Sequence, residues 1–536
     1  MKIPLLVPVA LALCLPGSRV VAESARPNIV IILADDLGFS DLGSFGSEIP
    51  TPHLDKLAAN GLRLTQFTNT SRCCPSRASL LTGLFQHQAG VGLMTSLQRD
   101  PASVGYQGRL NERSVTLAEV ARSAGYHTYM SGKWHLGQDD RAWWPRQRGF
   151  DRFYGILAGA TSYFRPADKY SLSQDNTVLP PPDDPDYYTT DAFTDYAIRF
   201  VREQADDAPF LLYLAYNAPH WPLHAPRADI DRFVGHYRGG WDRAREGRRA
   251  RQLELGVVEE EWGLSPRDAD VRPWEHLSEQ EQIELDYRMA TYAAQVYRID
   301  VSVGRLVAAL QELDRFDNTL ILFLSDNGGA PEPRPRAPGE RSDLGGGAFA
   351  DINNPDDVSM VSYGRGWAQV SNTPFAGFKA DSTEGGIAAP FIAHWPAGLR
   401  TPPGAIIDAP AYLIDVMPTL LELAQTTYPE ERDGQPLHPL EGSSLLPLFR
   451  EGQRVQPEWM YWEHRDQGAV RHGPWKALRQ ATDTWSLYHL DTDRTERHDL
   501  AAKEPERLDE LRRRWEEWAH SHLVYPKPSA GRAVTN

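Results

Sequence analysis

Three apolar, β-branched runs of the chain each end in polar side chains, and this pattern limits the folds that are open to it. The runs span residues 28–34, 210–216 and 319–324, and they are followed by Asp35-Asp36, by Asn217 and His220, and by Asp326-Asn327. Continuous apolar runs of this length are typical of parallel strands that are buried on both faces. Helical patterns lie between them, so the alternation predicts an α/β fold with a large, mostly parallel sheet covered by helices.

The polar side chains that follow these strands predict where a ligand binds. In open α/β sheets, ligands bind beyond the carboxyl ends of the strands, where all three polar groups would lie. A helix predicted over 116–124 supports the alternation, because Thr116 and Glu119 have the spacing of a capping box and Gly125 ends the pattern.

Three further regions depart from this pattern. Residues 227–290 are highly charged and contain tryptophan, and we expect a helical excursion over the core there. Residues 329–373 are rich in Gly and Pro without periodicity, which predicts a long loop at the rim of the site. After about residue 430, strand patterns at 459–463, 475–479 and 485–490 precede a helical pattern at 505–520. They predict a smaller C-terminal α+β domain.

The first 22 residues have the pattern of a secretory signal peptide. Lys2 precedes an apolar stretch, and Ala22 offers a small residue for cleavage. The apolar run is short for a membrane span and contains prolines, so we expect no stable membrane anchor. The expected organisation is a signal peptide at 1–22, a catalytic domain at 23–430, the C-terminal domain at 431–525 and a disordered tail at 526–536. The expected location is the periplasm or the outside of the cell.

The charge of the chain bears on its partners. The formal net charge of the 536 residues is -16, and it becomes -18 when Lys2 and Arg19 are removed with residues 1–22. An acidic surface repels nucleic acids at long range. We therefore expect no nucleic acid partner, and a small substrate bound in a locally basic pocket.

Only two cysteines remain after that cleavage, the neighbours Cys73 and Cys74. A disulfide between adjacent residues would force a short ring on a bond with a narrow range of geometry. An exported thiol without a disulfide partner needs another reason to be present, so we expect a chemical use for one of the two.

The sequence around Cys73 resembles a known modification signature. Cys73-x-Pro75-Ser76-Arg77, continuing to Leu81-Thr82-Gly83, is similar to the signature of the type I sulfatases. In that family a formylglycine-generating enzyme oxidises the leading cysteine to formylglycine (3-oxoalanine). Cys74 cannot take this place, because the residue two positions after it is Ser76 rather than proline.

Five further segments resemble the other blocks of the sulfatase family, in the same order. They are "PNIVIILADDLGFSDLG", "AGYHTYMSGKWHLG", "NAPHWPLHAP", "FLSDNGG" and "KADSTEGGIAAP". The resemblance extends from about Pro27 to the C-terminal "TERHDLAAKEPERL", and the segments "GYQGRLNERSVTLAEV" and "YGRGWAQVSNTPF" are most similar to bacterial arylsulfatases. Several blocks in register are far more specific than one. The resemblance implies the alkaline-phosphatase-like fold of the sulfatases.

The acids and the amide at the strand ends predict a metal site. Asp35, Asp36, Asp326 and Asn327 offer only oxygen ligands, which suit a hard cation such as Ca²⁺ better than zinc. A helix cap is the structural alternative for adjacent acids at a strand end. The resemblance implies that these four residues hold one Ca²⁺, with an oxygen of the modified Cys73 and one of the substrate's sulfate completing its shell.

The resemblance also implies a positively charged pocket made by Lys133, His135, His220 and Lys379. Taken singly, a lysine is usually a solvated surface charge and a histidine a structural side chain. Their placement in separate family blocks favours function, and Lys133 and Lys379 would neutralise sulfate oxygens in the transition state. His224 matches no functional position, and we expect it to be structural.

In the mechanism that the resemblance implies, the formylglycine hydrate carries two hydroxyls on one carbon. One attacks the sulfate ester, and the other loses its proton as sulfate is expelled. Arg77 and Lys133 would fix the hydrate, and Asp326 would accept the proton of the attacking hydroxyl. His135 would take the proton during expulsion, while His220 with Lys379 would assist departure of the alcohol. The products would be an alcohol or phenol and inorganic sulfate.

Two other functions remain open. The first is a phosphonate monoester or phosphodiester hydrolase of the same superfamily, which the complete "GKWHLG" and "APHWPLHAP" blocks disfavour. The second is a catalytically silent sulfate-ester binding protein, which the full set of matched catalytic positions disfavours. The sequence leaves open the choice among aryl, alkyl and sugar sulfates, and also the oligomeric state.

Overall fold

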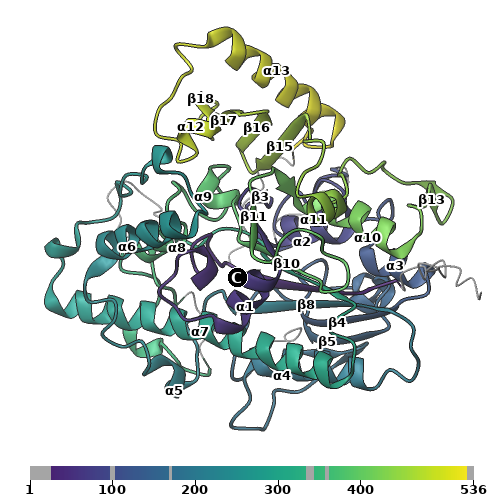
Figure 1. Ribbon diagram of the computed structural model, residues 1–536. Coiled ribbons are helices and arrows are strands. Elements are labelled where there is room, and N and C mark those ends of the chain that lie inside the picture. Colours follow the sequence, from purple (N-terminus) through teal and green to yellow (C-terminus); the bar gives the residue numbers. More distant parts are fainter. Residues whose placement is uncertain (1–25, 97–102, 168–171, 333–342, 357–360, 528–536) are drawn as a thin grey trace, which may run out of the picture.

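A ten-stranded sheet forms the centre of the protein (Figure 1). The computed structural model describes residues 26–96, 103–167, 172–332, 343–356 and 361–527. The predicted signal peptide at 1–22 lies outside these residues, as does most of the predicted tail. The strand order is β11-β2-β10-β9-β1-β8-β4-β5-β6-β7.

The middle of this sheet is parallel. Strands β9, β1, β8, β4 and β5 all run in one direction, whereas β10 is antiparallel to both of its neighbours. The strands of the sheet are β1 (Asn28–Asp35), β2 (Leu62–Leu64), β4 (His127–Lys133), β5 (Arg152–Ile156), β6 (Ser173–Gln174), β7 (Thr177–Val178), β8 (Phe210–Pro219), β9 (Thr319–Ser325), β10 (Phe391–His394) and β11 (Ala405–Ile407). The α/β class predicted from the three apolar runs is confirmed, since they form adjacent strands β1, β8 and β9.

Helices cover both faces of the sheet, because successive residues of a strand point to opposite sides. Ile29, Ile31 and Leu33 of β1 pack with α2, α3 and α10, whereas Val30 and Ile32 pack with α1, α4 and α7. The helices are α1 (Pro52–Asn60), α2 (Cys73–Thr82), α3 (Leu117–Ser123), α4 (Thr189–Arg202), α7 (Glu279–Glu312) and α10 (Val416–Ala424). Figure 1 shows α4 and α7 on the face away from the C-terminal strands.

The helix predicted after Thr116 is confirmed in its start and its end. The Thr116 hydroxyl accepts a hydrogen bond from the backbone N–H of Glu119, and the Glu119 carboxylate accepts one from the backbone N–H of Thr116. Gly125 follows the helix with a φ of 82°, in the left-handed region that favours glycine.

A smaller unit of strands and one long helix forms the C-terminal part. Its antiparallel sheet has the order β15-β16-β17-β18 and packs on α13 (Pro505–Ser521). The strands are β15 (Trp459–His464), β16 (Gln467–His472), β17 (Trp475–Arg479) and β18 (Trp485–His489). Strand β16 was not predicted, because its sequence has no apolar alternation of its own and its neighbours decide its pairing. Trp515 of α13 belongs to the same apolar cluster as Leu33, so the two parts share one core, and a boundary at residue 430 stays a prediction.

The two other unusual regions have different outcomes. Residues 227–290 are largely helical, as predicted, with α5 (Arg227–Ile230), α6 (Gly240–Leu255) and the start of α7. The expectation of an unbroken loop over 329–373 was wrong at α8 (Arg365–Ser371). Trp367 of this helix is fully buried and its indole N–H donates to the Leu285 carbonyl at 3.0 Å, so tertiary packing stabilises a helix too short to be stable alone.

The remaining elements are short. They are β3 (Phe67–Thr68), β12 (Ala411–Tyr412), β13 (Glu431–Arg432), β14 (Gln435–Pro436), α9 (Glu384–Ile387), α11 (Leu446–Glu451) and α12 (Leu490–Asp493). Within the described ranges, no helix combines the length and the apolar character needed to cross a bilayer.

Candidate active site

The register of the sheet brings the predicted site residues to one edge. Ala34 of β1 lies opposite Ser325 of β9, and Asp35 lies opposite Pro219 of β8. Because these strands are parallel, the residues that follow them meet at their carboxyl ends. Asp35, Asp36, His220, Asp326 and Asn327 therefore come together from segments that lie up to about 290 positions apart in the chain.

Cys73 is the first residue of α2, a helix in which all ten residues are buried. The residue is 1% exposed and lines a pocket of about 500 Å³, together with His135 and His220. Cys73 and Cys74 are both free cysteines, as expected. The thiol of Cys74 lies 3.8 Å from the Leu93 carbonyl oxygen, and burial with the nearby Cys73 raises the pKa of Cys74 to about 12. Cys74 thus stays a protonated, structural thiol.

Three buried cations pair with the carboxylates at the strand ends. Lys133 Nζ donates to Asp35 Oδ2 at 2.5 Å, and Lys379 Nζ donates to Asp36 Oδ1 at 2.5 Å. These side chains are at most 2% exposed. Burial opposes ionisation of Asp35, but the charges of Lys133 and Arg77 outweigh it and hold the pKa of Asp35 well below its usual range. The predicted lysines thus meet the predicted metal ligands.

Arg77 makes the third pair. Its Nε and Nη2 donate to Asp326 Oδ2 at 3.0 and 2.8 Å, and its Nη1 donates to the Lys133 carbonyl at 2.8 Å. Burial and the nearby Asp35 carboxylate raise the pKa of Asp326 to about 7, against the influence of Arg77. A carboxylate with its pKa near neutrality is suited to accept and release a proton.

Three buried oxygen atoms at this edge have no hydrogen-bond partner among the residues that the structure describes. They are Asp35 Oδ1, Asp36 Oδ2 and Asn327 Oδ1. Asn327 uses its amide nitrogen instead, which donates to Asp36 Oδ1 at 2.7 Å. An unpaired buried acceptor costs about 1–3 kcal/mol, and a cation would satisfy all three. Three hard oxygens fit a calcium ion, the metal that the sequence resemblance implies.

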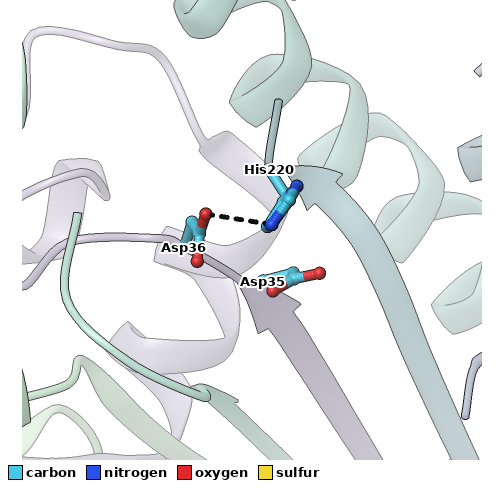
Figure 2. A group of neighbouring side chains, drawn as sticks. All are labelled: Asp35, Asp36 and His220. Atoms are coloured by element: carbon cyan, nitrogen blue, oxygen red, sulfur yellow. Dashed lines mark ion pairs between the residues drawn. The ribbon is translucent and has the colours of Figure 1, made fainter. Parts of the chain in front are cut away.

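The structure also brings His220 to the carboxylates (Figure 2). Ligand atoms of Asp35, Asp36 and His220 lie within 4.8 Å of one another, and Figure 2 shows the ring of His220 facing Asp36. His220 Nε2 lies 3.6 Å from Asp36 Oδ2, while its Nδ1 is 2.6 Å from the Trp221 carbonyl oxygen. That carbonyl fixes the ring, with Nδ1 as the donor and Nε2 directed to the site.

Both histidines of the pocket are held neutral. Burial lowers the pKa of His220 to about 4, although Asp36 partly opposes the shift. Burial, followed by the charges of Lys133 and Arg77, lowers the pKa of His135 well below its usual value. A neutral imidazole is ready to accept a proton, and it becomes a proton donor only when an added negative charge raises its pKa.

Some of the turns that carry or adjoin these side chains have strained backbone. Asp36, Ser71, His135 and Ala380 have φ values of 68°, 65°, 57° and 72°, in the left-handed region that such residues rarely adopt. Strain of this kind persists only where the surroundings over-determine it, and it clusters at functional sites. Gly159 makes room for one of these turns, because a Cβ there would lie 2.6 Å from the His135 ring.

Some pocket residues were not predicted. Arg72, Met94 and Trp221 line the pocket, and Arg72 Nε donates to Met94 Sδ at 3.3 Å while its Nη1 lies 3.6 Å from Glu332. Two of them directly adjoin predicted residues, Cys73 and His220, which is a signal that could have identified them.

His224 lies outside the pocket lining. It is fully buried against the rings of Tyr163 and Phe164, and the backbone N–H of Tyr163 donates to its Nδ1 at 3.4 Å. These contacts agree with the structural role expected from the sequence.

The geometry can be compared with known proteins. The family model for sulfatases matches residues 27–426, which contain every residue of the site described above. The chain belongs to the sulfatase family. Its family reaction is the hydrolysis of sulfate esters, so this sulfatase is a sulfuric ester hydrolase.

Relatives of this sulfatase cover most of its length. An uncharacterised sulfatase of Schizosaccharomyces pombe is 34% identical over 526 residues, which cover 92% of this chain and 93% of the relative. An arylsulfatase of Klebsiella aerogenes is 35% identical over 452 residues, which cover 81% and 95%. Among solved structures, the crystal structure of Ps i-CgsB has a TM-score of 0.67 at 27% identity, and the match covers 92% of this chain and 93% of that one. The predicted sulfatase fold is confirmed.

Proposed function

We propose that this sulfatase is of the arylsulfatase type and acts through a formylglycine made from Cys73 and one bound Ca²⁺. One observation carries the proposal: Cys73 lines a pocket beside buried carboxylates that have both unpaired oxygens and three cationic partners. An anionic sulfate ester would meet the positive charges of this pocket, and a divalent cation would meet the unpaired carboxylate oxygens. The likeness to the arylsulfatase of Klebsiella aerogenes, which is covered almost completely, supports the aryl type.

Asp35, Asp36, Asp326 and Asn327 would hold the metal, with the modified Cys73 beside it. A calcium ion there supplies positive charge that acidifies an oxygen nucleophile and stabilises the sulfate oxygens. The chain's own cations serve the same end, because Lys133 and Lys379 are buried and oriented before the substrate arrives. Preorganised charges in a water-poor site stabilise a transition state without the cost of reorganisation.

The burial of Cys73 bears on its maturation. A formylglycine hydrate supplies one hydroxyl to displace the alcohol from sulfur and a second whose proton is lost when sulfate is released. An enzyme cannot reach a thiol that is 1% exposed at the start of a fully buried helix. We therefore place the action of the formylglycine-generating enzyme before folding, which agrees with export of an unfolded chain directed by residues 1–22 to the periplasm or beyond.

The proposed proton transfers follow from the protonation states of the site. Asp326 accepts the proton of the attacking hydroxyl, while two hydrogen bonds from Arg77 hold its carboxylate in place. His135 is neutral and accepts a proton when sulfate leaves. His220 is neutral in the free enzyme, and the negative charge of the bound ester raises its pKa so that it can protonate the departing alcohol with Lys379.

The test uses protein produced together with a formylglycine-generating enzyme. We expect peptide mapping to find the aldehyde at Cys73, calcium to be bound in equimolar amount, and 4-nitrophenyl sulfate to be turned over faster than 4-nitrophenyl phosphate and the matching phosphonate ester. Faster turnover of a phosphate or phosphonate ester would favour the alternative hydrolase. An unmodified thiol at Cys73 in protein from the native host would favour a silent binding protein, and a higher kcat/KM for sugar sulfates than for aryl sulfates would exclude the aryl type.

A further inference from the structure

A second cluster of buried charges lies between the C-terminal strands and the catalytic part. We call Glu384, Lys476, Arg494 and Glu496 the boundary cluster. Lys476 Nζ of β17 donates to Glu384 Oε1 at 2.8 Å, and Arg494 Nε donates to Glu384 Oε2 at 2.8 Å. Lys476 Nζ also lies 2.8 Å from Glu496 Oε1, and all four side chains are at most 3% exposed. Glu384 alone comes from the catalytic part.

Glu384 is joined to the turn that presents Lys379. The backbone N–H of Phe378 donates to Asp381 Oδ2 at 3.0 Å, and that of Gly385 donates to the Ala376 carbonyl at 2.8 Å. The backbone is closely packed here, since a Cβ on Gly386 would lie 2.1 Å from the Asp381 carbonyl oxygen. Residues 376–386 therefore form one closely bonded unit, with Lys379 on one side and Glu384 on the other.

The same unit is bonded to the segment that leads to Cys73. The backbone N–H of Ala380 donates to the Ser71 carbonyl at 2.6 Å, and both residues have positive φ values. The backbone N–H of Lys379 donates to the Gly329 carbonyl at 3.1 Å, close to Asn327. A displacement of Glu384 would thus move Lys379 and strain the turn two residues before Cys73.

We infer that the C-terminal part positions the active site, with Lys476 and Arg494 holding Glu384 and thereby the ammonium group of Lys379. We call the strand ends that carry Asp35, Asp36, Asp326 and Asn327 the carboxylate edge. Lys476 is a positioning residue, because it lines neither the pocket nor the carboxylate edge. The inference rests on the proposed role of Lys379 in binding and neutralising sulfate. It gives the C-terminal domain a part in catalysis in addition to its share of the core.

The presence of ion pairs in the boundary cluster favours a role in orienting Glu384 over a role in stabilising the fold. Apolar side chains of similar volume often stabilise a buried position as well as an ion pair does. Ion pairs add direction, since a carboxylate with both oxygens bonded to cations from two segments can adopt only one orientation. Glu496 has a φ of 57°, and its Oε2 accepts a hydrogen bond from the backbone N–H of Glu384 at 3.0 Å, so the holding residues are themselves fixed.

A double-mutant cycle tests this inference. We expect Lys476→Met to lower kcat/KM for 4-nitrophenyl sulfate by about 10- to 100-fold and to weaken inhibition by inorganic sulfate. In a Lys379→Ala background the same substitution should change kcat/KM by less than about 3-fold, because the group that it positions is gone. Equal losses in both backgrounds, or no loss in the native background, would overturn the inference.

Two further variants complete the test. Lys527→Met is the matched control, since Lys527 also pairs with a buried glutamate of the C-terminal part, Glu463 at 2.8 Å, but does not contact residues 376–386. We expect it to leave kcat/KM within about 2-fold, and Lys476→Arg to restore part of the loss. If Lys476→Met does not fold, the cycle is run with Glu384→Gln, which keeps the shape of the side chain. If Lys379→Ala itself has native activity, the proposed role of Lys379 in binding sulfate is wrong. That result would not contradict the positioning of Lys379 by Lys476 and Arg494.

Discussion

The sulfatase contains two buried clusters of opposite charges that differ in how they use their oxygen atoms. At the carboxylate edge, Asp35, Asp36 and Asp326 pair with lysine or arginine side chains. Asp35 and Asp36 each keep one oxygen without a hydrogen bond in the described part of the chain. In the boundary cluster, both oxygens of Glu384 accept hydrogen bonds from cations.

This difference indicates that the carboxylate edge binds a ligand, whereas the boundary cluster holds parts of the chain in position. Unpaired buried acceptors are unfavourable by themselves, so the carboxylate edge is incomplete without a cation and an anionic substrate. It also opens to a pocket of about 500 Å³. None of the four side chains of the boundary cluster lines that pocket, and each of its two glutamates is paired with a cation of the chain. Pairs of carboxylates and cations thus bind a ligand at the carboxylate edge, whereas in the boundary cluster they make the structure rigid.

The largest expected effect concerns Cys73, which lines the pocket. Cys73→Ser should fold normally and lose at least about 10⁴-fold in multiple turnover, because a single hydroxyl cannot release sulfate in the way that a hydrate does. Steady-state kinetics with 4-nitrophenyl sulfate measure the loss. Cys74→Ser is the matched control and should keep most of the activity, and an aldehyde found at position 74 instead of 73 would contradict the assignment.

The next largest effect distinguishes the roles of His220 and His135 by how each variant's rate depends on the leaving group. His220→Ala should slow alkyl and phenyl sulfates by about 10² to 10⁴-fold but nitrophenyl sulfate much less, because a nitrophenolate leaves without protonation. His135→Ala should give a burst of alcohol followed by slow turnover that does not depend on the ester. A series of leaving groups measures both. Equal losses for His220→Ala across the series, with chemistry rate-limiting, would remove its role as general acid.

Removal of the metal should affect only one of the two clusters. Chelation of calcium should abolish turnover and lower the free energy of unfolding by about 3 kcal/mol relative to protein with calcium at 100 times its dissociation constant. Asp36→Asn should lose this stabilisation by calcium, whereas Glu384→Gln should retain it. Thermal unfolding at several calcium concentrations checks both variants, and stoichiometric zinc without calcium in the native protein would contradict the metal assignment.

The smallest expected effect lies within the boundary cluster. Burial raises the pKa of Glu496 to about 6 despite Lys476, whereas Lys476 and Arg494 outweigh burial and lower the pKa of Glu384 to about 2. The folded protein therefore binds a proton at Glu496 more tightly than the unfolded chain does, and the stability linked to it is present below pH 4.5 and lost as the pH rises through 6.

Replacing the two glutamates by glutamine should therefore change the free energy of unfolding in opposite directions. Glu496→Gln should equal the native protein below pH 4.5 and be more stable by about 2 kcal/mol above pH 6. Glu384→Gln should be less stable by about 3 kcal/mol at neutral pH, with the difference vanishing as the pH falls from 4.5 to 2. Urea unfolding between about pH 2 and 8 measures both. A lower stability of Glu496→Gln at pH 7 would show that its ion pair with Lys476 outweighs its burial.

The sequence predicts the carboxylate edge much better than the boundary cluster, for a physical reason. Asp35-Asp36 and Asp326-Asn327 directly follow apolar runs, so the geometry of a parallel sheet alone brings them together. Glu384 and Lys476 are 92 positions apart, and no periodicity relates a turn to a distant strand. The pair between Arg72 and Glu332 is hidden in the same way, as are β16 and α8, whose conformation depends on neighbours rather than on their own residues.

The burial of Cys73 has a consequence for any population of these molecules. On the proposed chemistry, each chain has one interval, between synthesis and folding, in which its thiol can be oxidised. Afterwards the thiol is buried at the start of α2, and a chain that missed the interval cannot be activated without unfolding. The fraction of active molecules then depends on the rate of Cys73 oxidation relative to the rate of folding. It does not change as the folded protein ages. Specific activity would therefore report the supply of the modifying enzyme at the time of synthesis.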